Sequence, residues 1–461
     1  MQALQDYIID KVVVDANTHN LLIANQLKDN VGTFVAEKVM PKIECQLRSL
    51  ESKNPLKVIR IPKLTLEIDI SCNDNKLQLQ ENSMSQIVDK IENVMSFSKN
   101  EEDSTVVLNE PDSKLSSFFH FLEKGTKPWW QGSGEKFVID LKTVIEISES
   151  DGFKEQFKQK LKKSSVRARL INQFSDEDIH AILLHTFKDK KEAVSILENY
   201  SQQEIKRLNG PVKKQIWSGL IEYFLTGDGE RLKKEVKRNR SDAENAKIAL
   251  SAGQNQQLQA AMAKILKKID LTPNHLDLDS KIDSKLLLVD ELNSQEDEND
   301  LYVENAGLIL LHPFLSYFFK DCGLLNDQDK IADPEMAIHL LHYVATKEEG
   351  QYEDCLVFEK FLCGIPIQQS INRNVRISKE MKAKVGELLG AVIKNWETLK
   401  NSSPDLLRNE FLQRPGKLNL KGKNPKLVVE RKTQDILLGK LTWNISIFKL
   451  PWMDKLIFID W

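Results

Sequence analysis

Residues Pro334–Thr346 read PEMAIHLLHYVAT, and this stretch decides how the last third of the chain folds. A proline is well tolerated at the first position of a helix, and the apolar residues behind it predict one helix over the whole segment. Comparable patterns predict helices over 307–320 and 379–399. The last third of the chain is therefore expected to have a helical body.

Downstream of these helices the apolar residues change to the alternation typical of strands. Strands are predicted over 426–431, 441–449 and 456–461, separated by Gly439 and Pro451. Residues 304–461 are therefore predicted to form a helical domain that is closed by a small antiparallel sheet at its end.

The chain upstream of this domain divides by composition into a linker and a helical segment. Residues 269–303 are strongly acidic and predict a solvated linker. Residues 114–268 are compatible with short helices joined by Gly and Pro, and they predict a helical array that contains the sequence Gly-Thr-Lys-Pro-Trp-Trp. Ser175 followed by three acidic residues predicts the start of a helix, because serine caps a helix and acids suit its positive end.

The N-terminal part is predicted to be a small α/β unit followed by a polar connector. Strands are expected over 7–15 and 59–70, with helical spacing between them and Pro41 permitting a kink, so that residues 1–72 form a strand-helix-strand domain. Residues 73–113 are polar and predict the connector. The fold class expected overall is mainly α, with a small α/β N-terminal unit, hence α+β.

Composition excludes several classes of protein. The chain has 461 residues and a formal net charge of -3, so the whole molecule has no electrostatic footprint for nucleic acid or an anionic membrane. Its apolar runs are far shorter than the roughly 20 residues that span a bilayer. The first residues lack the pattern of a signal peptide, and five scattered cysteines suit reduced thiols, so a cytoplasmic protein without membrane insertion is expected.

Motifs for catalysis are not evident. Gly132-Ser133-Gly134-Glu135-Lys136 lacks the spacing of a phosphate-binding loop, and no cofactor is expected. His339 and His342 are three residues apart on one helical face, but zinc needs three or four converging ligands. A metal-dependent enzyme centred on these histidines is kept as an alternative, although structural histidines are favoured and no catalytic or metal-binding residue is assigned.

Several stretches together resemble the contractile injection system tape measure protein family. The resemblance covers most of the chain, and its motifs are non-catalytic, so it implies a non-enzymatic role in a bacterial machine that resembles a phage tail. The matching stretches are the N-terminal strand Ile59–Ile70, Phe121–Trp130 with its Gly-Thr-Lys-Pro-Trp-Trp element, Asn305–Leu315, Cys322–Leu325, Ala337–Thr346, Phe361–Pro366, Val392–Trp396, Leu407–Gly416 and Trp443–Met453.

The resemblance implies a protein that lies in the growing tube and sets its length. As one continuous helix the chain would reach roughly 690 Å, although its 14 prolines prevent a single rod. The alternative is a compact adaptor or assembly chaperone of the same machine. Implied partners are inner tube, baseplate, spike or cap proteins. The candidate partner-contact residues are Trp129, Trp130, Trp443, Pro451 and Trp452, chosen because aromatic side chains anchor interfaces.

Overall fold

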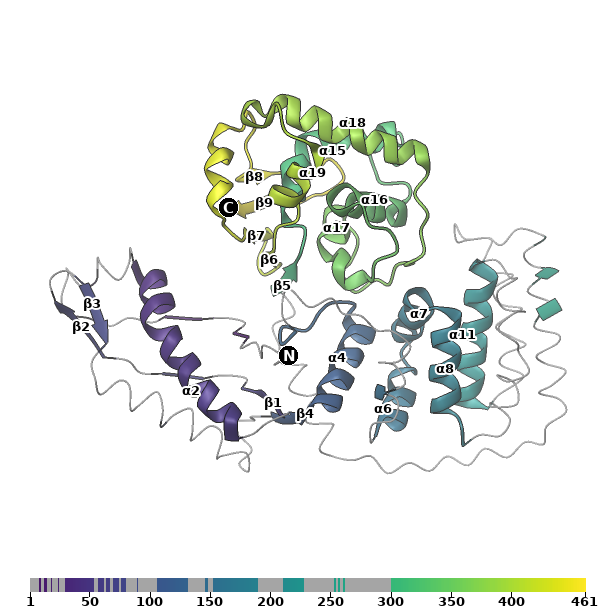
Figure 1. Ribbon diagram of the computed structural model, residues 1–461. Coiled ribbons are helices and arrows are strands. Elements are labelled where there is room, and N and C mark those ends of the chain that lie inside the picture. The colour runs from purple at the N-terminus through teal and green to yellow at the C-terminus, as the bar shows by residue number, and fades with distance from the viewer. Residues whose placement is uncertain are drawn as a thin grey trace. The chain divides into compact units, whose positions relative to one another are not determined.

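The computed structural model describes most of the chain and confirms an α+β fold (Figure 1). The described residues are 8–9, 12–14, 18, 24, 30–53, 57–61, 64–66, 69–73, 76–79, 89, 106–131, 146–147, 152–189, 210–227, 253, 256–257, 260–261 and 300–461. Most of the predicted acidic linker and the sequence Ser133–Lys136 lie outside them.

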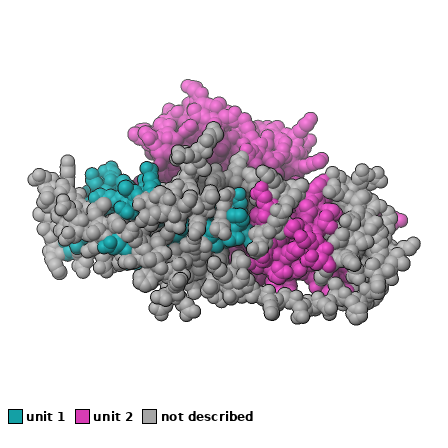
Figure 2. All heavy atoms as spheres, turned by 60° about the horizontal axis from the view of Figure 1, so that its bottom comes forward, with its two compact units in different colours: residues 1–116, 129–132, 283–296 teal, residues 117–128, 133–282, 297–461 magenta. Residues whose placement is uncertain are grey.

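The chain forms two compact units, coloured separately in Figure 2. The first comprises residues 1–116, 129–132 and 283–296, and the second comprises 117–128, 133–282 and 297–461. Described elements of the first unit are the π-helical turn η1 (Val35–Val39), helix α2 (Met40–Lys53), and strands β1 (Lys57–Arg60), β2 (Ile70–Asn73), β3 (Lys76–Leu79) and β4 (Val106–Asn109). Strand β1 pairs antiparallel with β4, and β2 pairs antiparallel with β3.

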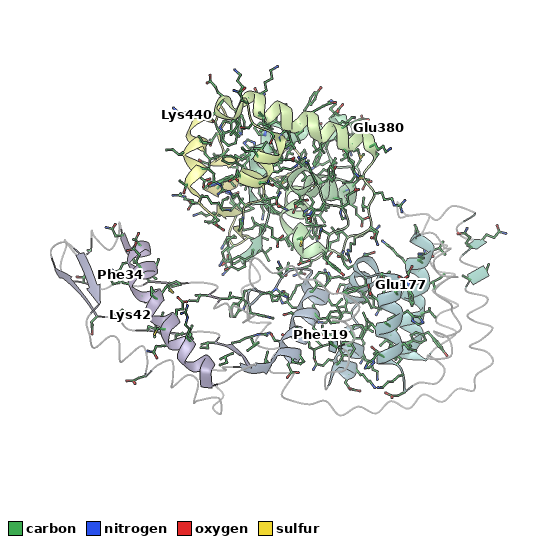
Figure 3. The ribbon with its side chains drawn as sticks, in the orientation of Figure 1. Phe34, Lys42, Phe119, Glu177, Glu380 and Lys440 are labelled. Carbon is green, nitrogen blue, oxygen red and sulfur yellow. The ribbon has the colours of Figure 1, made fainter. Side chains whose placement is uncertain are left out.

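A small apolar core holds the helical part of the first unit. Phe34, Val39 and Ile43 are buried together, and Phe34 is labelled in Figure 3. The π-helical turn η1 ends just before Pro41, which has no N–H group for the regular helical hydrogen bond and so favours this irregularity. The sequence permitted a kink at this proline, and the structure has one local irregularity there.

Both N-terminal strand predictions are wrong in detail. The described residues within 7–15 belong to no strand, and Val13 is 76% exposed, so these β-branched residues have no paired neighbour that would stabilise a strand. The predicted strand over 59–70 is divided: β1 ends at Arg60 and β2 begins at Ile70, with irregular backbone at Leu64 and Leu66, which pack on the helix instead.

A helical array opens the second unit. It consists of the part of α4 (Glu110–Lys124) from residue 117 onward, α6 (Phe153–Lys160), α7 (Ser164–Gln173), α8 (Asp176–Thr186) and α11 (Gly210–Thr226). Helix α7 packs on α11 and α6 on α8. Aromatic rings fill the space between α4 and α6, where Phe119, labelled in Figure 3, stacks on Phe153 at 5.9 Å between ring centroids.

Helix α8 begins where the sequence predicted. The Ser175 side chain accepts a hydrogen bond from the Asp178 amide, and the Asp178 carboxylate accepts one from the Ser175 amide, which completes a capping box. Asp176 in the first turn also accepts hydrogen bonds from Trp217 and Lys213 of α11. The cap thus fixes both the helix start and its contact with α11.

Residues 300–461 form what we call the C-terminal domain. Its α16 (Pro334–Thr346) matches the predicted helix, with Asp333 as N-cap and proline in the first turn. The other helical elements are η3 (Ala306–Leu311), α15 (His312–Asp321), η4 (Glu353–Leu356), α17 (Val357–Leu362), α18 (Lys379–Asn395), η5 (Glu397–Leu399), α19 (Pro404–Leu407), η6 (Arg408–Leu412) and η7 (Thr433–Lys440).

The sheet of this domain is mixed, which corrects the antiparallel prediction. Its order is β5-β6-β7-β9-β8, and β7 (Lys426–Val429) runs parallel to β9 (Ile457–Asp460). The segment between them is long enough for the crossover that a parallel pair needs. The predicted strand over 441–449 is reduced to β8 (Ile447–Phe448), and the sheet also contains β6 (Gly416–Asn419) and β5 (Asp300–Val303), which falls in the predicted linker.

Two glycines let the backbone of this domain pack closely. A Cβ atom at Gly307 would collide with the backbone of Phe411, and one at Gly416 would lie 2.9 Å from the Val428 carbonyl oxygen. Only glycine fits such close approaches. These positions join η3 to η6 and β6 to β7, so they tie the helices of the C-terminal domain to its sheet.

Candidate functional site

The Gly-Thr-Lys-Pro-Trp-Trp element begins at the end of α4 with a glycine that the backbone requires. Gly125 has a φ of 73°, in the left-handed region that ends many helices. A Cβ atom there would also collide with the side chains of Arg169 and Glu353. Thr126 follows and lies 3.2 Å from the Nε2 atom of His120. The element therefore shapes the backbone against a pair of charged side chains.

Those charged side chains form a buried ion pair between α7 and the C-terminal domain. Arg169 and Glu353 are both completely buried, and the Arg169 Nε atom donates to the Glu353 carboxylate. Arg169 also donates to the carbonyl oxygens of Leu122 and Gln368, each at 2.6 Å. A buried charge needs such partners, because an unpaired one is strongly destabilising.

Lys360 of α17 adds a second cation to this ion pair. Its Nζ atom lies 3.7 Å from the Glu353 carboxylate, and burial lowers its pKa to about 8. Glu353 accepts a further hydrogen bond from the Ile371 amide at 3.2 Å. We call Arg169, Glu353 and Lys360 the buried charge cluster. Nothing in the sequence pattern singled out these residues, because Arg169 and Glu353 are far apart along the chain.

A second group of charges lies where Lys127 of the same element meets the C-terminal domain. Lys127 donates to Glu304 at 2.9 Å; burial lowers its pKa, but the Glu304 carboxylate more than offsets this and the pKa is raised. Burial raises the pKa of Asp354 to about 7, with Lys127 acting in the opposite direction. Asp354 thus titrates near neutral pH.

The tryptophan pair of the element holds an arginine of the first unit. The Trp130 ring lies 3.9 Å from the guanidinium carbon of Arg60 and makes an edge contact with Trp129 at 5.9 Å. Arg60 also donates to Ser116 and Ser113, each at 3.0 Å. Both tryptophans are half-buried. They have a structural role here, and a partner contact through their exposed parts stays a prediction.

The other three candidate contact residues lie in the C-terminal domain. Trp452 is 8% exposed, packs on Phe319 and donates to the Leu362 carbonyl at 2.7 Å, so it contributes to the core. Trp443 is half-buried and donates to the Leu310 carbonyl at 3.1 Å. Pro451 is exposed. The five candidates therefore occupy separate places, and their contact with a partner stays a prediction.

Comparison with known proteins places this architecture in a family. Residues 6–461 match the contractile injection system tape measure protein family. The chain belongs to that family. No curated protein and no solved structure matches the chain detectably. The element of 125–130 and the C-terminal domain thus lie within a match that covers almost the whole tape measure protein sequence.

The family is one of structural and assembly proteins, and its members work with other components of a contractile injection system. Among the helices that the structure describes, none is long and apolar enough to cross a membrane. The chemistry open to the tape measure protein is therefore best sought in its protein contacts.

The two histidines of the enzyme alternative are held by different partners. The Nε2 atom of His339 lies 2.7 Å from the Asn372 carbonyl oxygen, whereas the Nδ1 atom of His342 lies 3.0 Å from Glu359. Burial lowers the pKa of His339. In the described part of the chain, no group of three or more His, Cys, Asp or Glu residues is arranged to hold a metal ion. The tape measure protein thus uses both imidazoles in packing.

Proposed function

We propose that this chain sets the length of the tube in its contractile injection system during assembly in the cytoplasm. The C-terminal domain would act as a folded anchor on a baseplate, spike or cap protein, and upstream helices would supply length along the inner tube. The proposal is supported first by the family match over residues 6–461.

One structural observation carries the division into anchor and length-setting segment. The largest apolar core of the C-terminal domain is built entirely from residues between 301 and 461, with Leu308, Leu340 and Trp396 at 0% exposure. A domain with its own core keeps its fold when its neighbours move. The helical array is therefore free to change arrangement without loss of the anchor.

The second candidate, a compact adaptor or assembly chaperone, is favoured by the buried charge cluster. Arg169 is fully buried against Glu353, so drawing the helical array away from the C-terminal domain would expose or separate the pair. Breaking such a pair by removing one partner costs about 3–5 kcal/mol, although water solvates both charges when they separate fully. The chain is thus compact until something in the assembly compensates for this loss.

A tube-length experiment distinguishes the two candidates. Helix-forming inserts of about 28 and about 56 residues are placed after Gly227, in a strain that makes the particles. Because a helix rises about 1.5 Å per residue, tubes should lengthen by about 40 and about 80 Å. A matched insert after Asp327, in an exposed loop of the C-terminal domain, should leave the length unchanged.

Electron microscopy of uncontracted particles provides the measurement. Lengthening by the first pair of inserts alone supports the ruler. Particles of normal length with all three inserts would remove it and leave the adaptor as the better account.

A further inference from the structure

The C-terminal sheet has one buried face and one apolar face in solvent. Side chains of directly paired residues lie on the same side of a sheet. Tyr302 pairs with Lys417, which pairs with Val428, and Phe458 pairs with Ile447, so these residues face one way. The residues between them along the strands, including Leu418, Leu427 and Ile457, are fully buried on the other face.

The outward side chains are unusually apolar for a surface in water. The exposed fractions are 41% for Tyr302, 42% for Val428, 38% for Ile447 and 39% for Phe458, and Leu456 just before β9 is 41% exposed. Single exposed apolar residues need no explanation, but a group spread over β5, β7, β8 and β9 indicates an interaction site. We call these five residues the outer sheet patch.

Lysines gather at one end of the outer sheet patch. The β6–β7 turn, the residue after β8 and the start of β9 meet at this end, because β9 runs parallel to β7 and β8 runs antiparallel to it. All five lysines there are exposed, and Asp454 is the acidic residue among these segments. The lysines are Lys421, Lys423, Lys426, Lys449 and Lys455.

Existing ion pairs balance part of this charge and leave the rest for a partner. Lys426 lies 3.5 Å from Asp460, which also lies 3.1 Å from Arg431. At such exposed positions an ion pair contributes little to stability, whereas a basic patch steers and orients an acidic partner. The surface therefore combines an apolar patch with a basic end.

We propose that the outer sheet patch docks an acidic amphipathic segment of another protein of the injection system. The apolar side chains of that segment would cover Val428 and Phe458, and its carboxylates would meet the lysines. A second copy of this chain would bring the same lysines and no acidic counterpart, so it fits less well. The proposal needs an anchor, which both candidate functions use, so it does not depend on length-setting.

Site-specific photocrosslinking in the full chain tests this proposal. A photoreactive residue replaces Val428 or Phe458 in a producing strain, and mass spectrometry identifies the cross-linked peptide. The expected product is another component of the machine, joined through a peptide rich in Asp and Glu. Glu387, on the exposed side of α18, is the control position and should give no such product.

Charge variants sharpen the result. The triple variant Lys423→Glu, Lys449→Glu, Lys455→Glu should reduce the yield by about tenfold or more, and the matching Lys→Arg triple should retain it. Equal melting temperatures of the two triples show that folding is intact. A product with a second copy, with the acidic part of this chain, or with no protein at all would overturn the proposal, whatever the tube-length experiment gives.

Discussion

The C-terminal domain and its contact with the helical array use opposite physical means. Inside the domain, Trp396 packs on Phe411 at 4.8 Å and is fully buried among apolar residues. At the contact with α7, the fully buried residues are Arg169, Glu353 and Lys360. Apolar packing provides stability with little directional preference, whereas a buried ion pair fixes position but contributes little net stability.

This difference explains how one chain combines a firm domain with a separable contact. Water cannot replace the apolar partners of Trp396, so the core resists opening. Water does solvate Arg169 and Glu353 once they separate, so the contact has an open state of moderate cost. The four variants that follow test each side of this comparison, from the largest expected effect to the smallest.

Trp396→Ala should have the largest effect because it opens a cavity in the core of the C-terminal domain. Replacing a buried large aromatic residue with alanine costs about 3–5 kcal/mol, and the hydrogen bond from Trp396 to the Leu437 carbonyl is lost as well. Chemical denaturation followed by tryptophan fluorescence measures the loss. A change below about 1 kcal/mol would show that the apolar core is less important than described.

Arg169→Met should destabilise the contact by about 3 kcal/mol, because it leaves Glu353 buried beside Lys360 alone. Hydrogen exchange should rise in α7 and near residue 370 while α16 stays protected. The double variant Arg169→Met, Glu353→Met should recover much of the loss, since the pKa of Lys360 is already lowered and it loses its charge readily. A double variant less stable than the single would contradict the account.

Asp354→Asn should raise stability at pH 8 by about 2 kcal/mol and leave it nearly unchanged at pH 4. Burial raises the pKa of Asp354 to about 7 from 3.8, so the folded chain binds this proton more tightly between those values. Its contribution to stability is therefore present at low pH and is lost as pH rises through about 7. Melting temperatures of both proteins from pH 4 to 8 provide the test, and parallel curves would contradict this pKa.

Ser175→Ala should have the smallest effect, about 1 kcal/mol, because it removes the side-chain cap of α8. Ser175→Asp is the matched control, since aspartate also caps, and should restore the loss. Hydrogen exchange should rise at the start of α8 without change in the C-terminal domain. Exchange that rises in both would show that the two parts do not open separately.

Local signals predicted the helices well and the sheet less well. Helix α16 could be predicted because its start, Pro334, and its apolar residues act within the segment itself. The strand predicted over 441–449 is mostly absent because tertiary contacts compete: Trp443 donates to the Leu310 carbonyl, and the Asn444 carbonyl accepts from His312. Strand β5 exists through pairing with β6, more than one hundred residues away, which no local pattern shows.

The candidate site could be predicted in position but not in chemistry. The Gly-Thr-Lys-Pro-Trp-Trp element marked the right segment, because Gly125 requires a special backbone conformation and tryptophans are uncommon. Its contacts with Arg169 and Glu353 depend on residues brought together by folding. The exposed side of the sheet was also missed, since alternation alone does not say which face a partner or solvent covers.

The central claim is that the C-terminal domain is complete without the helical array, and the isolated fragment 297–461 tests it most directly. Its chemical denaturation should show a single cooperative transition, with slow hydrogen exchange in α16 and α18 as in the full chain. A fragment that unfolds without cooperativity, or that exchanges all its amides rapidly, would contradict a self-contained anchor.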